Sequence, residues 1–257
     1  MELVCGATRA VFDPTCGGRL ASLRFEGAEV LVTEGSSDTE WGGYPMAPWA
    51  GRVREGRFCW AGQDRQLPQN LPPHALHGTV FGAPWTVSGE GQMWCPLGPE
   101  WPWAGEVRSV VSVESDRLCW QLEVHAEAEP FPAVLGWHPW FRRRLADGAT
   151  ATLDFQPASM LERDAAGIPT GRRVSPTQGP WDDCFPEIHA SPKLTWSNGL
   201  AVEVSSSCSH WVVYDEPEHA VCIEPQSGPP DAFNLDGAVV VRPGRPLVQT
   251  MVIRMLK

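Results

Sequence analysis

Glu224 is the residue best placed for acid–base chemistry. It directly follows the apolar run Val221-Cys222-Ile223 and opens the proline-rich segment Ile223–Asn234. A short apolar run of this kind predicts a buried strand, so the carboxyl group stands at the strand's end, partly removed from water. Desolvation raises the pKa of a carboxyl group and suits it to act as a general base near neutral pH. A buried structural carboxyl group is the alternative interpretation.

Three further segments carry more polar and aromatic side chains than strand formation requires. They are Gly42–Phe58, which holds Arg52 among small residues, Leu71–Gly82, which holds His74 and His77, and Leu135–Phe141, in which His138 precedes a proline. An imidazole can give or take a proton near neutral pH, and a guanidinium supplies fixed positive charge. Single residues of these types are more often structural or exposed, so position alone leaves their roles open.

The composition excludes several classes of function. The chain has 257 residues, a net charge of −11 and one short basic run, Arg142-Arg143-Arg144, which argues against nucleic-acid binding. Its N-terminus does not resemble a signal peptide, and no apolar stretch approaches the ~18 residues of a membrane helix. The eight cysteines form no Cys-x-x-Cys pair and no short-spaced cluster with histidine. We therefore expect reduced thiols, a cytoplasmic location and no metal site.

The hydrophobic pattern predicts an all-β protein with few or no long helices. Short alternating or β-branched runs recur between turn signals rich in glycine and proline, and they are Val107–Val113, Cys119–Val124, Thr150–Phe155, Leu200–Val204, Trp211–Tyr214, Val221–Ile223, Val239–Arg242 and Val248–Leu256. Leu194–Val204 is typical of a hairpin, because its central Asn198-Gly199 accepts positive φ angles. No repeat or linker is visible, so residues 1–257 are expected to form one antiparallel β-sandwich domain.

Five motifs, in order along the chain, resemble those of one enzyme family. They are Ala50-Gly51-Arg52-Val53 followed by Gly56-Arg57-Phe58, then Leu76-His77-Gly78, His138-Pro139-Trp140-Phe141, Asp182-Asp183-Cys184-Phe185, and Glu224-Pro225-Gln226 with Pro230-Asp231-Ala232-Phe233-Asn234. The sequence resembles an aldose 1-epimerase (mutarotase) of the galactose mutarotase-like superfamily. Two positions depart from the family pattern, Gly51 in place of asparagine and Thr79 in place of a second glycine.

The resemblance implies an antiparallel β-supersandwich that interconverts the α and β anomers of an aldose without metal or cofactor. It makes Glu224 the general base and His138 the general acid. The sugar hydroxyls would be bound by Arg52, His77 and Asp182. Asp183 is the rival of Asp182 for the inward-facing carboxylate. Acid–base catalysis fits this reaction, because the C1 hydroxyl must lose a proton while the ring oxygen gains one.

Other interpretations stay open at this level. A hexose-6-phosphate 1-epimerase would need a cationic pocket, which Arg54, Arg57 or Arg142–Arg144 could supply. A carbohydrate-binding module on the same fold would keep the pocket without catalysis. Tryptophans near the motifs predict a more apolar floor, either stacked on a sugar or simply packed, and they are Trp49, Trp137 and Trp140. The expected partner is a small aldose, with a monomer as the default state and a dimer as the alternative.

Overall fold

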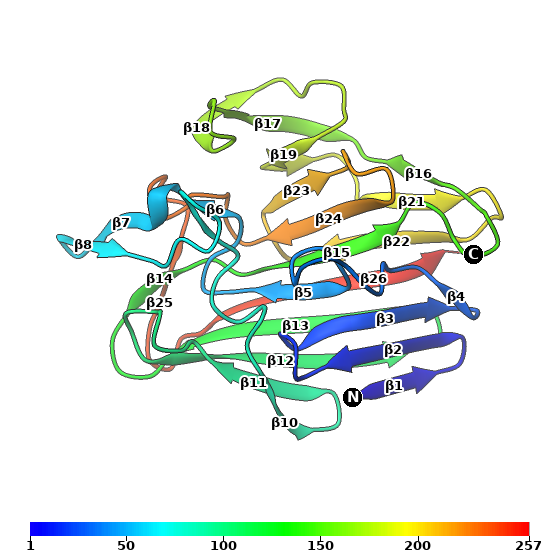
Figure 1. Cartoon of the computed structure of the whole chain (residues 1–257), viewed down its shortest axis with the longest axis horizontal. Helices are drawn as coiled ribbons and strands as arrows, with labels where there is room; N and C mark the ends of the chain where they lie inside the picture. The colour runs from blue at the N-terminus through cyan, green and yellow to red at the C-terminus, as the bar shows by residue number, and fades with distance from the viewer. Residues whose placement is uncertain (257) are drawn as a thin grey trace.

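The computed structural model describes residues 1–256 and consists almost entirely of antiparallel strands (Figure 1). A nine-stranded sheet contains, in spatial order, β1 (Glu2–Cys5), β2 (Thr8–Asp13), β3 (Arg19–Phe25), β5 (Gly43–Met46), β15 (Gly136–Arg142), β24 (Ala220–Gln226), β23 (His210–Tyr214) and β19 (Asp182–Phe185), with β4 (Ala28–Glu29) paired to β3. The one helical element within these residues is a 3-10 turn, η1 (Arg54–Gly56).

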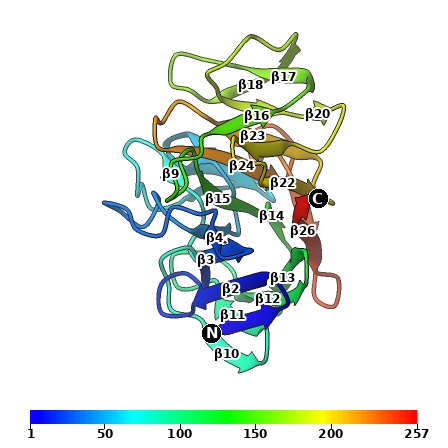
Figure 2. The ribbon, with the colours of Figure 1, turned by 90° about the vertical axis from the view of Figure 1, so that its right-hand side faces the viewer.

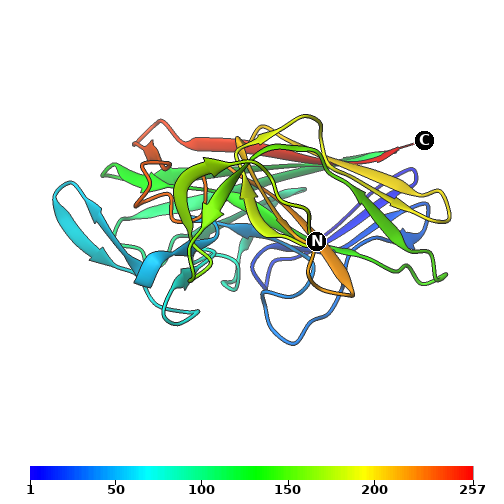
Figure 3. The ribbon, with the colours of Figure 1, turned by 90° about the horizontal axis from the view of Figure 1, so that it is seen from above.

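A second sheet of eight strands packs against the first. Its strands, in spatial order, are β10 (Thr86–Gly89), β11 (Gln92–Pro96), β12 (Gly105–Glu114), β13 (Arg117–Ala126), β26 (Leu247–Leu256), β22 (Ala201–Ser206), β21 (Lys193–Trp196) and β16 (Ala151–Asp154). Seen from above, the two sheets form stacked layers, with β26 in red in one of them (Figure 3). The main hydrophobic core lies between the layers, where the ring of Phe12 meets Trp120 edge-on at 5.0 Å and Trp120 meets Trp137 at 6.4 Å.

Four small sheets complete the fold. They pair β14 (Phe131–Ala133) with β25 (Val239–Val241), β6 (Arg52–Val53) with β9 (Ala75–Leu76), β7 (Arg57–Trp60) with β8 (Gln63–Gln66), and β17 (Pro157–Arg163) with both β18 (Pro169–Val174) and β20 (Glu187–Ile188). The sheet around β17 lies at one end of the molecule, next to the edge strand β19 (Figures 1 and 2). None of the helices in residues 1–256 is long and apolar enough to cross a membrane.

The predicted β-class and strands are confirmed. Each of the eight predicted runs overlaps a strand of the second sheet, the nine-stranded sheet or β25, and Leu194–Val204 forms the β21–β22 hairpin, with Gly199 at φ 93°. The strands of the N-terminal third and β15 were not predicted. β5 and β15 contain glycine and proline, whereas β1, β2 and β3 are short and carry charged residues, so none was singled out by the hydrophobic pattern, and pairing with neighbouring strands decides their conformation.

Candidate active site

A row of side chains crosses the middle of the nine-stranded sheet. Tyr44 on β5 is the register partner of His138 on β15. The pairing of Gly136 with Gln226 fixes the register of β15 against β24 and places His138 opposite Glu224. Successive residues of a strand point to opposite faces, so the neighbours of these residues, such as Trp137 and Ile223, pack in the main core. The row itself faces away from the second sheet, into a pocket.

His138 and Glu224 contact each other at the floor of this pocket. His138 Nε2 lies 3.1 Å from Glu224 Oε1, and the two residues are 5% and 2% exposed. The ladder between β15 and β24 is interrupted at this level, since Pro139 and Pro225 have no N–H to donate. Adjacent strands thus bring an imidazole and a carboxyl group together without a backbone hydrogen bond between them.

Burial controls the protonation of the pair. It lowers the pKa of His138 to about 3 and raises the pKa of Glu224 well above its usual value, an increase to which the nearby Asp182 carboxylate adds. An uncharged pair, with the proton on Glu224 and a neutral imidazole, satisfies both shifts. Moving that proton across the 3.1 Å contact creates a carboxylate and an imidazolium. The pair therefore holds one proton that can reside on either partner, which is the requirement for concerted acid–base chemistry.

The pocket above the pair has a volume of about 430 Å³. All five residues predicted to form the site line it, namely Arg52, His77, His138, Asp182 and Glu224. The lining holds five carboxyl groups (Glu40, Asp182, Asp183, Glu216 and Glu224) against two guanidinium groups (Arg52 and Arg163). Acidic groups therefore outnumber basic groups in the lining of the pocket. No group of three or more His, Cys, Asp or Glu side chains in residues 1–256 is arranged to hold a metal ion.

His77 presents one defined tautomer to the pocket. Its Nδ1 accepts a hydrogen bond from the Gly51 N–H at 3.3 Å, while its own backbone N–H donates to the Gly51 carbonyl at 3.0 Å. Burial, together with His138 and Arg52, lowers the pKa of His77 well below its usual value. The neutral ring therefore carries its proton on Nε2, where it can donate to a ligand.

Gly51 is required by this arrangement. The residue has φ 69°, and a Cβ there would lie 2.7 Å from the Pro230 side chain. The departure from the family's asparagine thus has a local cause, because Pro230 occupies the space that a side chain would need.

Asp182 and Asp183, successive residues of β19, both line the pocket. The Oδ2 atom of Asp182 is 3.6 Å from Nη1 of Arg52 and 3.3 Å from Nη1 of Arg163, and Asp183 Oδ1 accepts from Arg163 Nε at 2.8 Å. In the register of β19 with β23, Asp182 pairs with Tyr214, which also lines the pocket, and Asp183 pairs with Val213 of the main core. Burial raises the pKa of both carboxyl groups, and the guanidinium charges oppose the increase.

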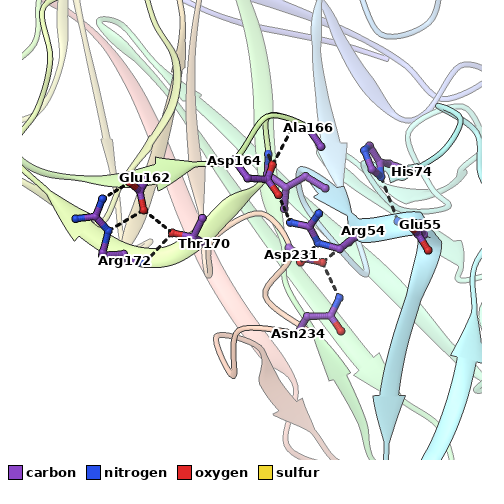
Figure 4. Close-up of polar contacts among 11 residues, drawn as sticks. Arg54, Glu55, His74, Glu162, Asp164, Ala166, Thr170, Arg172, Asp231 and Asn234 are labelled. Carbon is purple, nitrogen blue, oxygen red and sulfur yellow. Dashed lines mark hydrogen bonds and ion pairs between the residues drawn. The ribbon is translucent and has the colours of Figure 1, made fainter.

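Asp231 fixes the strand that carries Arg52. Its buried carboxylate accepts hydrogen bonds from the Arg54 N–H at 2.9 Å and from Asn234 Nδ2 at 2.7 Å, and its backbone N–H donates to the Arg52 carbonyl at 2.7 Å. Arg54 in turn contacts Asp164 at 2.7 Å (Figure 4). The motif around Asp231 therefore has a structural function, which the sequence did not reveal.

The arginines considered for phosphate binding are not in the pocket lining, and they are Arg54, Arg57, Arg142, Arg143 and Arg144. Arg54 is engaged by Asp164, and Arg57 is exposed beside Gln66. The Arg142–Arg144 side chains donate to backbone carbonyls of neighbouring loops. The only guanidinium groups that line the pocket within residues 1–256, those of Arg52 and Arg163, already contact Asp182.

The tryptophans near the motifs pack within the protein. Trp49 and Trp137 belong to the main core. Trp140 lines the pocket, but its indole is 5% exposed and stacks on His138 and on His219 at centroid distances of 5.4 and 5.9 Å. None of the three leaves a ring face open to a sugar, so the packing interpretation is the correct one for these residues.

Sequence reasoning missed several residues of the pocket. Tyr44 lies in a segment that was singled out, and Gln226 stands two positions after Glu224, a spacing that places both on one strand face. Arg163 gave no signal, because it comes from the distant β17 hairpin and reaches the site only through the packing of β17 on β19.

Comparison with solved structures identifies the class of fold. The chain superposes on a galactose mutarotase-like protein from Clostridium acetobutylicum with a TM-score of 0.86 and 15% identity, covering 100% of this chain and 94% of that one. The GalM/aldose epimerase homologue from C. elegans gives 0.82 and 18%, with 100% and 98% covered. The galactose 1-epimerase from Lactobacillus acidophilus NCFM gives 0.76 and 14%, with 98% and 92% covered. The architecture is galactose mutarotase-like.

Sequence comparison identifies the family. Residues 6–254 match the family model described as aldose 1-epimerase. The chain belongs to the aldose 1-epimerase family, a family of isomerases. A stretch of 104 residues, 38% of the chain, is 32% identical to the uncharacterized protein YphB of Escherichia coli (strain K12) and spans 36% of that protein's length.

Proposed function

We propose that the protein is an aldose 1-epimerase in which Glu224 is the general base and His138 the general acid. The observation that carries the proposal is the buried 3.1 Å contact between Glu224 and His138 at the floor of the pocket. The two groups share one proton, and both can reach oxygens bonded to the same carbon of a sugar that lies above them.

The reaction follows from the movement of that proton. In the reactive form, Glu224 is a carboxylate and His138 an imidazolium. Glu224 takes the proton of the C1 hydroxyl while His138 protonates the ring oxygen, the bond between C1 and the ring oxygen breaks, and an open-chain aldehyde forms. Glu224 is then protonated and His138 neutral, the form that burial favours. Rotation about the C1–C2 bond exposes the other face of the aldehyde, and the same transfers in reverse close the ring.

The remaining polar groups orient the sugar. His77 Nε2–H can donate to a hydroxyl, because Gly51 occupies Nδ1. Asp182 can accept from hydroxyl groups while Arg52 and Arg163 keep its charge compensated. Arg52 also places a positive charge on the wall of the pocket, where negative charge develops on the sugar oxygen.

The charge of the pocket favours an uncharged aldose over a hexose 6-phosphate. A phosphate group would meet Glu40 and Glu216 in the lining and would compete with Asp182 for Arg52 and Arg163. Each close like-charge contact opposes binding in a partly desolvated site.

Polarimetry tests the proposal. Freshly dissolved α-glucose and α-galactose should reach the same final optical rotation faster with the protein than without it. Glucose 6-phosphate should show the smallest acceleration of mutarotation. Glu224→Gln and His138→Asn should each lower the acceleration by about 10²- to 10⁴-fold, the usual contribution of one proton transfer. A protein that binds the sugars but leaves their mutarotation unchanged would be a carbohydrate-binding module, the alternative function of this pocket.

A further inference from the structure

Gln226 has an unusual environment within the pocket. The residue is fully buried, lines the pocket, and donates from Nε2 to Glu224 Oε2 at 3.3 Å. Its Oε1 atom has no hydrogen-bond partner within residues 1–256. The amide is oriented with Nε2 toward Glu224 and Oε1 away from it. An unpartnered buried carbonyl oxygen is unfavourable, and a hydrogen-bond donor on a ligand in the pocket would satisfy it.

The fold holds this side chain in place. Gln226 follows Glu224 by two residues on β24, so both side chains project from the same face of the sheet. Opposite it stands Gly136 of β15, where a Cβ would lie 3.0 Å from Gln226 Cγ. The Ser227 N–H donates to the Leu135 carbonyl and the Leu135 N–H donates to Ser227 Oγ, so the chain directly after Gln226 is fixed. The absence of a side chain at Gly136 thus makes room for the Gln226 amide beside the pair.

We infer that Gln226 is a further positioning and specificity residue, whose Nε2 orients the Glu224 carboxylate and whose Oε1 accepts a hydrogen bond from one hydroxyl group of the sugar. The inference rests on the proposed function and extends it. The Nε2 donor occupies Oε2 of Glu224 and leaves Oε1 for exchange of the proton with His138 and the C1 hydroxyl. The site therefore recognises a polyhydroxylated aldose with a hydroxyl donor on the Gln226 side of C1.

Gln226→Met separates these roles from simple packing, because methionine keeps the length of the side chain and removes both polar atoms. A matched control is Gln121→Met on β13, since Gln121 Nε2 also donates to a glutamate two residues away, Glu123 at 2.7 Å, outside the pocket. Both variants are assayed by polarimetry on the parent aldose and on monodeoxy sugars that each lack one hydroxyl group. We expect Gln226→Met to lower kcat/KM for the parent sugar by about 10- to 100-fold, while Gln121→Met stays at the wild-type value.

The deoxy series and the pH profile supply the decisive readings. One deoxy sugar should lose less than the others on going from wild type to Gln226→Met, because the hydroxyl that Oε1 binds is already missing and only the positioning of Glu224 is lost. The bond from Gln226 lowers the pKa of Glu224, so its removal should move the alkaline limb of the rate profile to higher pH. An equal loss on every sugar with an unchanged profile would overturn the inference and leave Gln226 a packing residue.

Failure of the proposed function gives a different pattern. If the wild-type protein does not accelerate mutarotation, the epimerase assignment fails whatever Gln226 does. The proposed contact between Gln226 Oε1 and a sugar hydroxyl is then tested by measuring the affinities for the same sugars by calorimetric titration. Gln226→Met should weaken binding of the parent sugar and leave the affinity for one deoxy sugar unchanged, whereas a uniform effect across the series would refute the contact.

Discussion

The Glu224–His138 pair should leave a signature in the pH dependence of stability. In the folded protein, burial raises the pKa of Glu224 well above its usual value and lowers that of His138 to about 3, so the pair keeps one proton over a wide range. In the unfolded chain the two groups titrate near about 4.3 and about 6.5. The unfolded pair thus holds two protons at low pH, one between these values and none above them. The free energy of unfolding rises with pH wherever the unfolded state binds more protons, and falls where it binds fewer.

The magnitude follows from this proton count. Glu224, with its raised pKa, loses its contribution as pH rises above about 4.3, whereas His138, with its lowered pKa, loses its contribution as pH falls below about 6.5. Between these values the two slopes cancel. Above about 6.5 only the Glu224 slope remains, so the free energy of unfolding should fall by about 1.4 kcal/mol per pH unit until the folded pKa of Glu224 is reached. Below about 4.3 the His138 slope acts alone and stability falls toward acid.

Urea unfolding followed by tryptophan fluorescence measures this effect. The stability of the double variant Glu224→Gln/His138→Asn, subtracted from that of wild type at each pH, should give a plateau that declines on both sides. The same subtraction is made for the single variants. Relative to the double variant, Glu224→Gln keeps His138 and should show only the acid decline, and His138→Asn keeps Glu224 and should show only the decline at higher pH. A difference between wild type and double variant that stays constant from pH 7 to pH 8 would refute the reasoning, because the folded pair would then not retain its proton.

Two further changes test how the site is supported. Gly51→Ala should destabilise the protein by about 2–4 kcal/mol in urea unfolding, because its Cβ meets Pro230 and its φ is positive. Gly62→Ala, at φ 75° with no atom within 4 Å, is the control and should cost about 1 kcal/mol; equal losses would exclude the clash. Asp231→Ala should cost about 2–4 kcal/mol and raise the sugar KM, since the Arg54 N–H loses its acceptor. Asp231→Asn keeps an acceptor oxygen and tolerates the left-handed backbone, so a loss as large as that of alanine would contradict this role.

The sequence was informative wherever local physics decides the outcome. Regular alternation in Val107–Val113 and Cys119–Val124 led to β12 and β13, since one face of each strand is buried. Asn198-Gly199 indicated the β21–β22 hairpin through its need for positive φ. The apolar run before Glu224 correctly predicted a buried strand, but β24 continues to Gln226, so the carboxyl group lies within the strand and not at its predicted end. The order of the motifs indicated the family that the match over residues 6–254 shows.

The remaining features depend on contacts between segments far apart in the chain. No local pattern places His138 opposite Glu224, because the two residues are 86 positions apart in the chain and only the sheet register brings their strands side by side. Both Asp182 and Asp183 reach the pocket, and only Asp182 contacts Arg52 as well as Arg163, a result of the pairing of β19 with β23 and of the packing of β17 on β19.

The roles of Arg163 and Gln226 also depend on tertiary contacts. Arg163 enters the site because the β17 hairpin packs on β19. Gln226 belongs to a motif that the sequence shows, but the missing partner of its buried Oε1 appears only in the folded chain. The sequence by itself determined the β-class of this protein, its family and the chemical types of its reactive groups, because alternation, turn chemistry and short motifs are written in consecutive residues. Tertiary structure decided their register, burial and pKa values, because these depend on which strands become neighbours and on how much water remains between them.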